Sequence, residues 1–185
     1  MILAFLGPPG SGKGTQAKLL AEKLKVPHIS LGDILREEVR AGSEVGKRAK
    51  AIMEAGRLVP DELTIELTRK RIGGEDCRNG FILDGFPRSA AQAEAFDKML
   101  AENKLTLDRV IYFRISEEEV VKRLLLRAGL EGRADDNEDA IRTRFEVYES
   151  QTRPLIEHYA RMGKLQEIDA ARPIEQVSAA LAQVL

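Results

Sequence analysis

Residues 7–15 read GPPGSGKGT, and this stretch decides the fold because of what stands on each side of it. An apolar run, Ile2 to Leu6, comes directly before it, and a segment with helical spacing, Thr15 to Leu24, follows at once. Strand, glycine-rich loop and helix in this order are the setting of the GxxxxGK phosphate-binding loop. Glycines let backbone N–H groups approach a phosphate closely, and the helix points its positive end at the same place. A glycine-rich turn without a ligand is the alternative, but the context favours binding of a nucleoside triphosphate.

The loop residues expected to contact the triphosphate are Gly10, Ser11, Gly12, Lys13, Gly14 and Thr15. Lys13 supplies a point charge for the outer phosphates. The hydroxyl residue that usually follows the lysine is replaced by Gly14, and Thr15 comes one place later. The side-chain hydroxyl expected to face Mg²⁺ is therefore displaced by one residue, to Thr15.

Apolar runs alternate with segments of helical spacing along the chain. Buried strands are predicted at Ile2 to Leu6, Pro27 to Ser30, Phe81 to Leu83, Val110 to Ile115 and Leu165 to Ile168. Helices are predicted at Thr15 to Leu24, at Asp61 to Ile72, after Ser116, from Asn137 to about Met162 with an interruption at Pro154, and from Pro173 onward. Strands that alternate with helices indicate a parallel sheet covered on both faces, which is an α/β fold.

Two stretches fit this alternation poorly. Residues 30–59 have a helical pattern throughout, interrupted by Gly42, Gly46 and Gly56. Residues 128–136 form a short polar segment. Both are expected to leave the sheet core as excursions, which makes them candidate mobile flaps.

Composition limits the class of protein. The 185 residues correspond to a single domain, 1–185, and a hydrophobic fraction of 43% is too high for a disordered chain. A net charge of −1 argues against a nucleic-acid partner, because such proteins usually carry a basic surplus. No apolar run approaches the roughly 18 residues of a membrane span, and the apolar start is too short for a signal segment. A soluble, cytoplasmic protein with no nucleic-acid and no membrane partner is expected.

A single cysteine, Cys77, can form neither an internal disulfide nor a cysteine-based zinc site. We assign no chemistry to Cys77, His28 or His158 and expect them to be structural or surface residues.

A second motif, Asn79 to Arg88, places Asp84 at the end of an apolar strand. Because the carboxyl ends of parallel strands meet at one crevice, Asp84 is expected near the phosphate loop, where it can hold Mg²⁺ through water. Gly85 permits close backbone approach, and Arg88 presents a guanidinium fork for a second phosphate. Gln92, four residues further on, shares the helical face of Arg88 and could read the edge of a base. A strand-terminating turn with a surface arginine is the alternative.

The chain resembles the adenylate kinase family in five segments, which follow in order over essentially its whole length: GPPGSGKGTQA, GDILR, DGFPRS, GRADDNED and RTRFEVYESQTRPL. Members of this family are nucleoside monophosphate kinases that convert ATP and AMP reversibly into two ADP. The resemblance implies a P-loop NTPase-like, five-stranded parallel sheet flanked by helices. It also implies a helical monophosphate-binding insert at residues 30–59 and a lid at residues 126–136. The lid is of the short type, without room for a small zinc domain, so no structural zinc is expected.

The resemblance also implies site residues, motif by motif. Outside the loop, those implied to bind ATP are Arg123, Arg127 and Arg172. Those implied to bind AMP are Leu31, Arg36, Arg57, Leu58, Val59, Gly85, Phe86, Pro87, Arg88, Gln92, Arg133 and Arg144. Those expected to meet the charge of the migrating phosphoryl group are Lys13, Asp84, Arg88, Arg123, Arg133 and Arg144. Any one arginine could instead lie on a solvated helix face, and Asp135 and Asp136 could simply favour the start of a helix.

The expected partners are ATP, AMP and ADP, with Mg²⁺ held by the nucleotide and by waters near Thr15 and Asp84, and the expected state is a monomer. Leu31 stands where the family commonly has threonine, so one polar contact near the monophosphate base is lost. A kinase for UMP or CMP therefore stays open as an alternative. A P-loop switch that hydrolyses nucleotide slowly is a further alternative, but it would not require a second basic site at Arg36 and Arg88.

Overall fold

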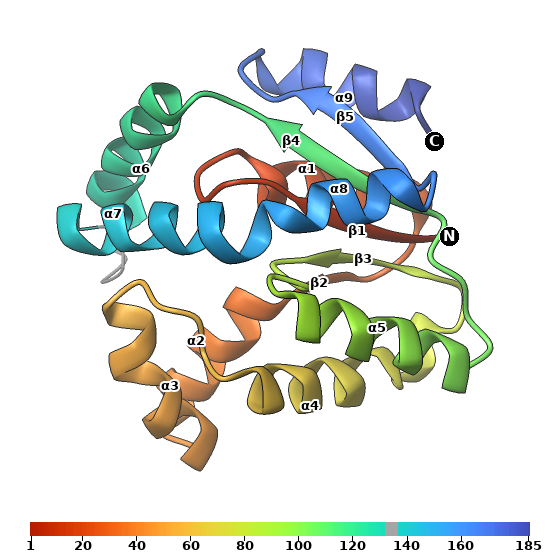
Figure 1. Ribbon diagram of the computed structural model, residues 1–185, viewed down its shortest axis with the longest axis horizontal. Coiled ribbons are helices and arrows are strands. Elements are labelled where there is room, and N and C mark those ends of the chain that lie inside the picture. The colour runs from red at the N-terminus through yellow and green to blue at the C-terminus, as the bar shows by residue number, and fades with distance from the viewer. Residues whose placement is uncertain (132–136) are drawn as a thin grey trace.

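The computed structural model describes residues 1–131 and 137–185 of the chain (Figure 1). A parallel sheet of five strands, in the order β2-β3-β1-β4-β5, forms its centre. The strands are β1 Ile2–Leu6, β2 His28–Ser30, β3 Phe81–Asp84, β4 Arg109–Arg114 and β5 Leu165–Asp169. The predicted α/β fold with a five-stranded parallel sheet is confirmed, and every predicted strand agrees to within one residue at each end.

Helices cover both faces of the sheet and extend beyond the edge where the strands end. They are α1 Lys13–Leu24, α2 Leu31–Ala41, α3 Glu44–Glu54, α4 Asp61–Ile72, α5 Ala90–Glu102, α6 Glu117–Glu131, α7 Glu138–Val147, α8 Pro154–Arg161 and α9 Ile174–Gln183. A short 3₁₀ helix, η1 Glu75–Cys77, and a π-helix, η2 Tyr148–Thr152, complete them. None of the helices in the described part of the chain is long and apolar enough to cross a membrane.

The sheet is buried on both faces because the side chains of each strand alternate between two hydrophobic cores. In β1, Ile2, Ala4 and Leu6 face the core that α4, α5 and α8 complete. Leu3 and Phe5 face the second core, which α1 and α9 complete. Such two-sided burial explains why β1 reads as a continuous apolar run instead of an alternating one.

The long helical segment predicted from Asn137 to about Met162 is divided near Pro154, where the sequence predicts an interruption. It consists of α7, the π-helix η2 and α8, which begins at Pro154. Proline lacks the N–H that an α-helix interior needs, and it is tolerated at a first helical position. In Figure 1 the three parts follow one another without a sharp turn, so the segment still spans the molecule.

The first of the two stretches that did not fit the alternation, residues 30–59, lies at the carboxyl edge of the sheet. Residues 31–54 form α2 and α3, which pack against each other outside the sheet (Figure 1). Serine side chains begin both helices, because Ser30 Oγ accepts a hydrogen bond from Asp33 N (3.2 Å) and Ser43 Oγ accepts one from Gly46 N (2.9 Å). Of the expected lid, residues 126–131 form the end of α6, and residues 132–136 lie outside the described residues.

Candidate active site

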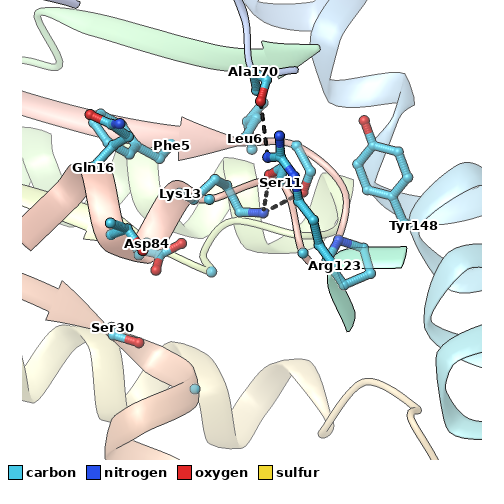
Figure 2. A pocket seen from close by; sticks show the side chains of 18 of the residues that line it. Phe5, Leu6, Ser11, Lys13, Gln16, Ser30, Asp84, Arg123, Tyr148 and Ala170 are labelled. Carbon is cyan, nitrogen blue, oxygen red and sulfur yellow. Dashed lines mark hydrogen bonds between the residues drawn. The ribbon is translucent and has the colours of Figure 1, made fainter. Parts of the chain in front are cut away.

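A cavity of about 570 Å³ opens at the carboxyl edge of the sheet. All six predicted loop residues line it. Asp84 lines it too, because β3, which ends at Asp84, pairs with β1, so the carboxylate lies near the phosphate loop as its position at a strand end predicts. The predicted arginines that line it are Arg36, Arg88, Arg123, Arg127, Arg144 and Arg172. Figure 2 shows Lys13, Ser11 and Arg123 gathered around the loop, with Asp84 beside Lys13.

The loop that follows β1 needs its glycines for conformation and for space. Gly10 and Gly12 have φ angles of 80° and 87°, a region that side chains disfavour. A Cβ at Gly10 would also lie 2.8 Å from the Leu124 side chain of α6. Among the described residues, no side chain caps α1 and no acid lies in its first turn, so its N–H groups remain suited to an anion.

Lys13 bonds back to the loop that carries it. Its Nζ donates hydrogen bonds to Gly7 O (2.7 Å), Pro8 O (2.8 Å) and Ser11 Oγ (3.2 Å). Burial lowers the pKa of Lys13 to about 7, although the nearby Asp84 acts in the opposite direction. A phosphate beside Nζ would favour the charged form and raise this pKa.

Asp84 is ionised in spite of its burial. Burial alone would raise the pKa of its carboxyl, but His28, Lys13 and Arg88 together hold it below the ordinary value. The carboxylate also lies against the first turn of α1, where a Cβ on Gly14 would be 3.3 Å from Oδ2. An ionised carboxylate beside the phosphate loop, with the exposed Thr15 hydroxyl in the same cavity, suits Mg²⁺, which keeps several waters and takes few protein ligands.

Side chains that could bind a metal ion do not form a cluster in the described part of the chain. No group of three or more His, Cys, Asp or Glu residues there could hold a metal ion by itself.

The guanidinium groups of Arg123 and Arg172 are held by carbonyl oxygens and carboxylates. Arg123 donates to Ala170 O (3.0 Å), Ala171 O (3.3 Å) and Glu119 Oε1 (2.9 Å), which ties α6 to the segment after β5. Figure 2 shows Arg123 reaching across to Ala170. Arg172 donates from Nε to Asp169 Oδ2 (3.3 Å). Such bonds fix the direction of each side chain before a ligand arrives.

A second, smaller cavity of about 70 Å³ adjoins the first. The residues that line both are Gly32, Arg36, Gly56, Leu58, Gly85, Arg88 and Arg144. Three of these seven are arginines, so a shared basic boundary separates the two spaces. Arg36 donates to Asp33 Oδ1 (2.6 Å), and Arg88 donates from Nε to Gly85 O (2.9 Å).

Most residues implied to bind AMP lie around this second cavity. It is lined by Leu31, Arg36, Arg57, Leu58, Val59, Gly85, Arg88, Gln92 and Arg144, and Pro87 lines the larger cavity. Phe86 lines neither cavity. Its ring is fully buried and packs edge-on against Phe96, so a ligand contact by this side chain has no support. Arg133, Asp135 and Asp136 lie outside the described residues.

Some residues at the site are not predicted by any sequence motif. His28, to which we assigned no chemistry, lines the larger cavity with its Nε2 3.7 Å from Asp84 Oδ2. Thr152 of η2 donates a hydrogen bond to Arg88 O (2.8 Å). Tyr148 lines the same cavity (Figure 2). The order of the strands, which pairs Ser30 with Asp84, would have placed His28 near the site, but no motif marks it.

The fold and this site define a P-loop nucleotide-binding protein whose phosphate loop faces a second, arginine-lined space. Comparison with known proteins narrows the class. Residues 5–164 match the model of the family described as adenylate kinase, and the chain belongs to this family of phosphotransferase enzymes. The resemblance stated from the sequence motifs is confirmed.

Several curated relatives, each named adenylate kinase, are similar along nearly their whole length. The protein of Thermobifida fusca is 51% identical over 178 residues, which cover 96% of this chain and 94% of the relative. The protein of Rhizobium meliloti is 49% identical with full coverage of both chains. The protein of Corynebacterium urealyticum is 49% identical, with 97% and 96% covered.

Proposed function

We propose that this protein transfers the terminal phosphoryl group of ATP to AMP, reversibly and with Mg²⁺, to give two ADP. The observation that carries the proposal is the shared boundary of the two cavities, where Arg36, Arg88 and Arg144 line both. A phosphoryl group passing from one nucleotide to the other would cross this boundary. Membership of the adenylate kinase family supports ATP and AMP as the pair.

The larger cavity is proposed as the ATP site. Backbone N–H groups from Gly10 to Thr15 and the start of α1 would hold the β- and γ-phosphates, with Lys13 as the point charge. Arg123, Arg127 and Arg172 would complete the site around the rest of the nucleotide. Because Arg123 is already fixed by two carbonyl oxygens, little side-chain entropy would be lost when ATP binds.

The smaller cavity is proposed as the AMP site. Arg36, Arg88 and Arg144 are suited to the monophosphate, because a guanidinium fork matches phosphate oxygens. Arg57, Leu58, Val59, Leu31 and Gln92 would surround the base, with the backbone of residues 85–87 alongside. A purely hydrolytic switch would not need this second set of cations.

Phosphoryl transfer in this arrangement depends on alignment and charge. Lys13, Arg88, Arg123, Arg144 and, in the proposed lid, Arg133 would neutralise charge that spreads over the migrating group. A phosphate monoester oxygen is already anionic, so no side chain has to remove a proton from it. Mg²⁺, when bound with ATP, supplies further neutralisation of the phosphates, and Asp84 and Thr15 would hold it through water.

We propose the insert at residues 30–59 and the lid at residues 126–136 as the parts that close over the two nucleotides. Closure excludes water, which would otherwise accept the phosphoryl group. A cytoplasmic monomer without nucleic-acid or membrane partners is proposed as the working form, in line with a net charge of −1.

An acceptor comparison tests the substrate pair. ADP formation is measured with Mg²⁺, ATP and each of AMP, UMP, CMP and GMP in turn, over a range of acceptor concentrations. The expected result is a kcat/KM highest for AMP. A higher value for UMP or CMP would overturn the choice of acceptor, and ADP formation that needs no acceptor would overturn the transfer itself.

A further inference from the structure

Gln92 lines the smaller cavity and is nevertheless almost fully buried, with 1% of its surface exposed. Its Nε2 donates hydrogen bonds to Asp61 Oδ1 (2.6 Å) and to Thr64 Oγ1 (3.2 Å). Its Oε1 accepts one from Arg88 N (2.7 Å). An amide nitrogen has two hydrogens and an amide oxygen has two lone pairs. With these partners among the described residues, the oxygen keeps a second lone pair for a ligand, whereas both hydrogens of the amide nitrogen are used.

The orientation of this amide follows from the polarity of its neighbours. Exchange of the oxygen and the nitrogen would leave the shape unchanged, so the partners must decide which is which. The Asp61 carboxylate only accepts hydrogen bonds, and the Arg88 N–H only donates. Thr64 donates its hydroxyl hydrogen to Asp61 O (2.9 Å), which leaves it an acceptor toward Gln92. All three neighbours demand the same orientation.

Asp61 is itself held in place at the start of α4. Its second carboxylate oxygen, Oδ2, accepts a hydrogen bond from Ser89 Oγ (2.9 Å), and Ser89 begins α5. One carboxylate thereby joins α4, α5 and the Gln92 amide. One part of the cavity wall is apolar, because Leu31, Leu35, Met53 and Val59 line it without a side-chain nitrogen or oxygen atom, whereas the arginines that line it carry only donors. Gln92 is thus the lining side chain with an amide oxygen that can accept a hydrogen bond from a base.

We infer that Asp61 is a positioning residue that sets acceptor specificity, by fixing the Gln92 amide so that it offers only its oxygen to the base. The inference rests on the proposed function and adds the reason for the choice of base. An exocyclic amino group can donate to this oxygen. A carbonyl group at the same position would bring two acceptors together with no hydrogen between them, which leaves buried polar atoms unpaired.

AMP and IMP form the matched pair of acceptors for the test, because position 6 of the purine carries an amino group in AMP and a carbonyl group in IMP, and N1 carries a hydrogen only in IMP. The variant is Asp61→Asn, whose amide can present either a donor or an acceptor to Gln92. The control is Glu62→Gln on the exposed side of α4, which removes the same charge one residue away. Steady-state kinetics with AMP and IMP give the ratio of the two kcat/KM values, and thermal unfolding reports stability.

The wild type is expected to prefer AMP, and Asp61→Asn is expected to lower the AMP-to-IMP ratio by about tenfold, the effect of one mispaired hydrogen bond. KM for ATP should stay unchanged, and Glu62→Gln should keep the wild-type ratio. Thr64→Val removes the hydroxyl that accepts a hydrogen bond from Gln92 and keeps the shape of the side chain. It should also lower the AMP-to-IMP ratio, by less than Asp61→Asn does. If Asp61→Asn does not fold, the kinetics of Thr64→Val provide the test.

Two results would overturn the inference. One is an unchanged AMP-to-IMP ratio in folded Asp61→Asn or Thr64→Val. The other is an equal loss of activity with both acceptors, which is what a merely structural role of Asp61 would give. Failure of the proposed function looks different, because the wild type would then phosphorylate neither monophosphate, and the inference would fall with it.

Discussion

At the scale of single residues, we expect the charge of the Lys13 side chain to depend on a bound ligand. With a pKa lowered to about 7 by burial, its amine is mostly neutral at pH 8, whereas a bound triphosphate would stabilise the protonated form. Binding of ATP should therefore take up a proton above pH 7. Because proton uptake and ATP binding are linked, the affinity for ATP should fall by up to about tenfold per pH unit from pH 7 upward. This fall should end where the pH reaches the raised pKa that Lys13 has in the ATP complex.

Calorimetric titration of ATP at pH 8, in two buffers of different ionisation enthalpy, measures this proton uptake. We expect an uptake approaching one proton for each ATP at pH 8 and a much smaller uptake at pH 6, where Lys13 is already charged. The same uptake at both pH values, or none at pH 8, would contradict the assigned state of Lys13.

Under the proposed function, Arg88 distinguishes an enzyme that binds two nucleotides from a protein that only binds ATP. Arg88→Ala removes a guanidinium from the boundary of the cavities and leaves the phosphate loop intact. We expect kcat to fall by about a hundredfold or more, as for other electrostatic groups at a transition state, while the Kd for ATP changes little.

A matched control for this variant is Arg78→Ala, since Arg78 is mostly exposed and pairs only with Glu75 across 3.4 Å among the described residues. Its kinetics should equal those of the wild type. If Arg88→Ala keeps full phosphoryl transfer, the acceptor site is misplaced.

Residues within a local motif could be predicted from the sequence, and residues brought in by the fold could not. The loop around Lys13 and the strand end at Asp84 are recognisable because a short stretch contains both the backbone geometry and the chemistry. The contact of Thr152 with Arg88 and that of Asp61 with Gln92 join residues 64 and 31 positions apart. No spacing rule connects such pairs, so only the packed helices reveal them.

At the scale of elements, α2 and α3 pack so closely that a glycine is required between them. A Cβ on Gly46 would overlap the backbone carbonyl of Glu38 and lie 2.6 Å from Val39 N. Gly46→Ala should therefore push the two helices apart, at a cost of about 1–3 kcal/mol in the free energy of unfolding. Because this pair carries Arg36 and Leu31, KM for AMP should rise while KM for ATP stays near the wild-type value.

The measurement pairs chemical denaturation with kinetics for each substrate. Gly73→Ala serves as the control, since a Cβ there would lie 3.4 Å from Arg69 O, which is ordinary van der Waals contact, and the φ of −74° suits any residue. An equal rise in both KM values would argue against a separate AMP-binding insert.

The bounds of helices and strands could be predicted from local sequence signals, but the arrangement of these elements in space could not. Asp61–Ile72 begins after Pro60 with acids in its first turn, and the predicted bounds agree with α4. The order of the strands and the π-helix at Tyr148–Thr152 were not predicted. Strand order depends on which faces the connecting helices cover, and the π-helix is part of a tertiary site, so neither is fixed by nearby residues.

At the scale of the whole molecule, one sheet edge gathers groups from distant parts of a nearly neutral chain. The net charge is −1, yet Lys13 and six arginines line a single cavity. A long nucleic acid needs a basic surface, whereas two nucleotides need a basic cleft. The division of that cleft into two spaces with a shared arginine boundary is the basis of the proposed transfer from ATP to AMP.

Transfer between two bound nucleotides is tested most directly by following the phosphoryl group itself. The protein is incubated with Mg²⁺, unlabelled AMP and ATP that carries ³²P at the γ-position, and the products are separated. We predict that the label appears in the β-phosphoryl group of ADP, in step with the loss of ATP, with at most traces in inorganic phosphate. Label released as inorganic phosphate, with none in ADP, would contradict the account.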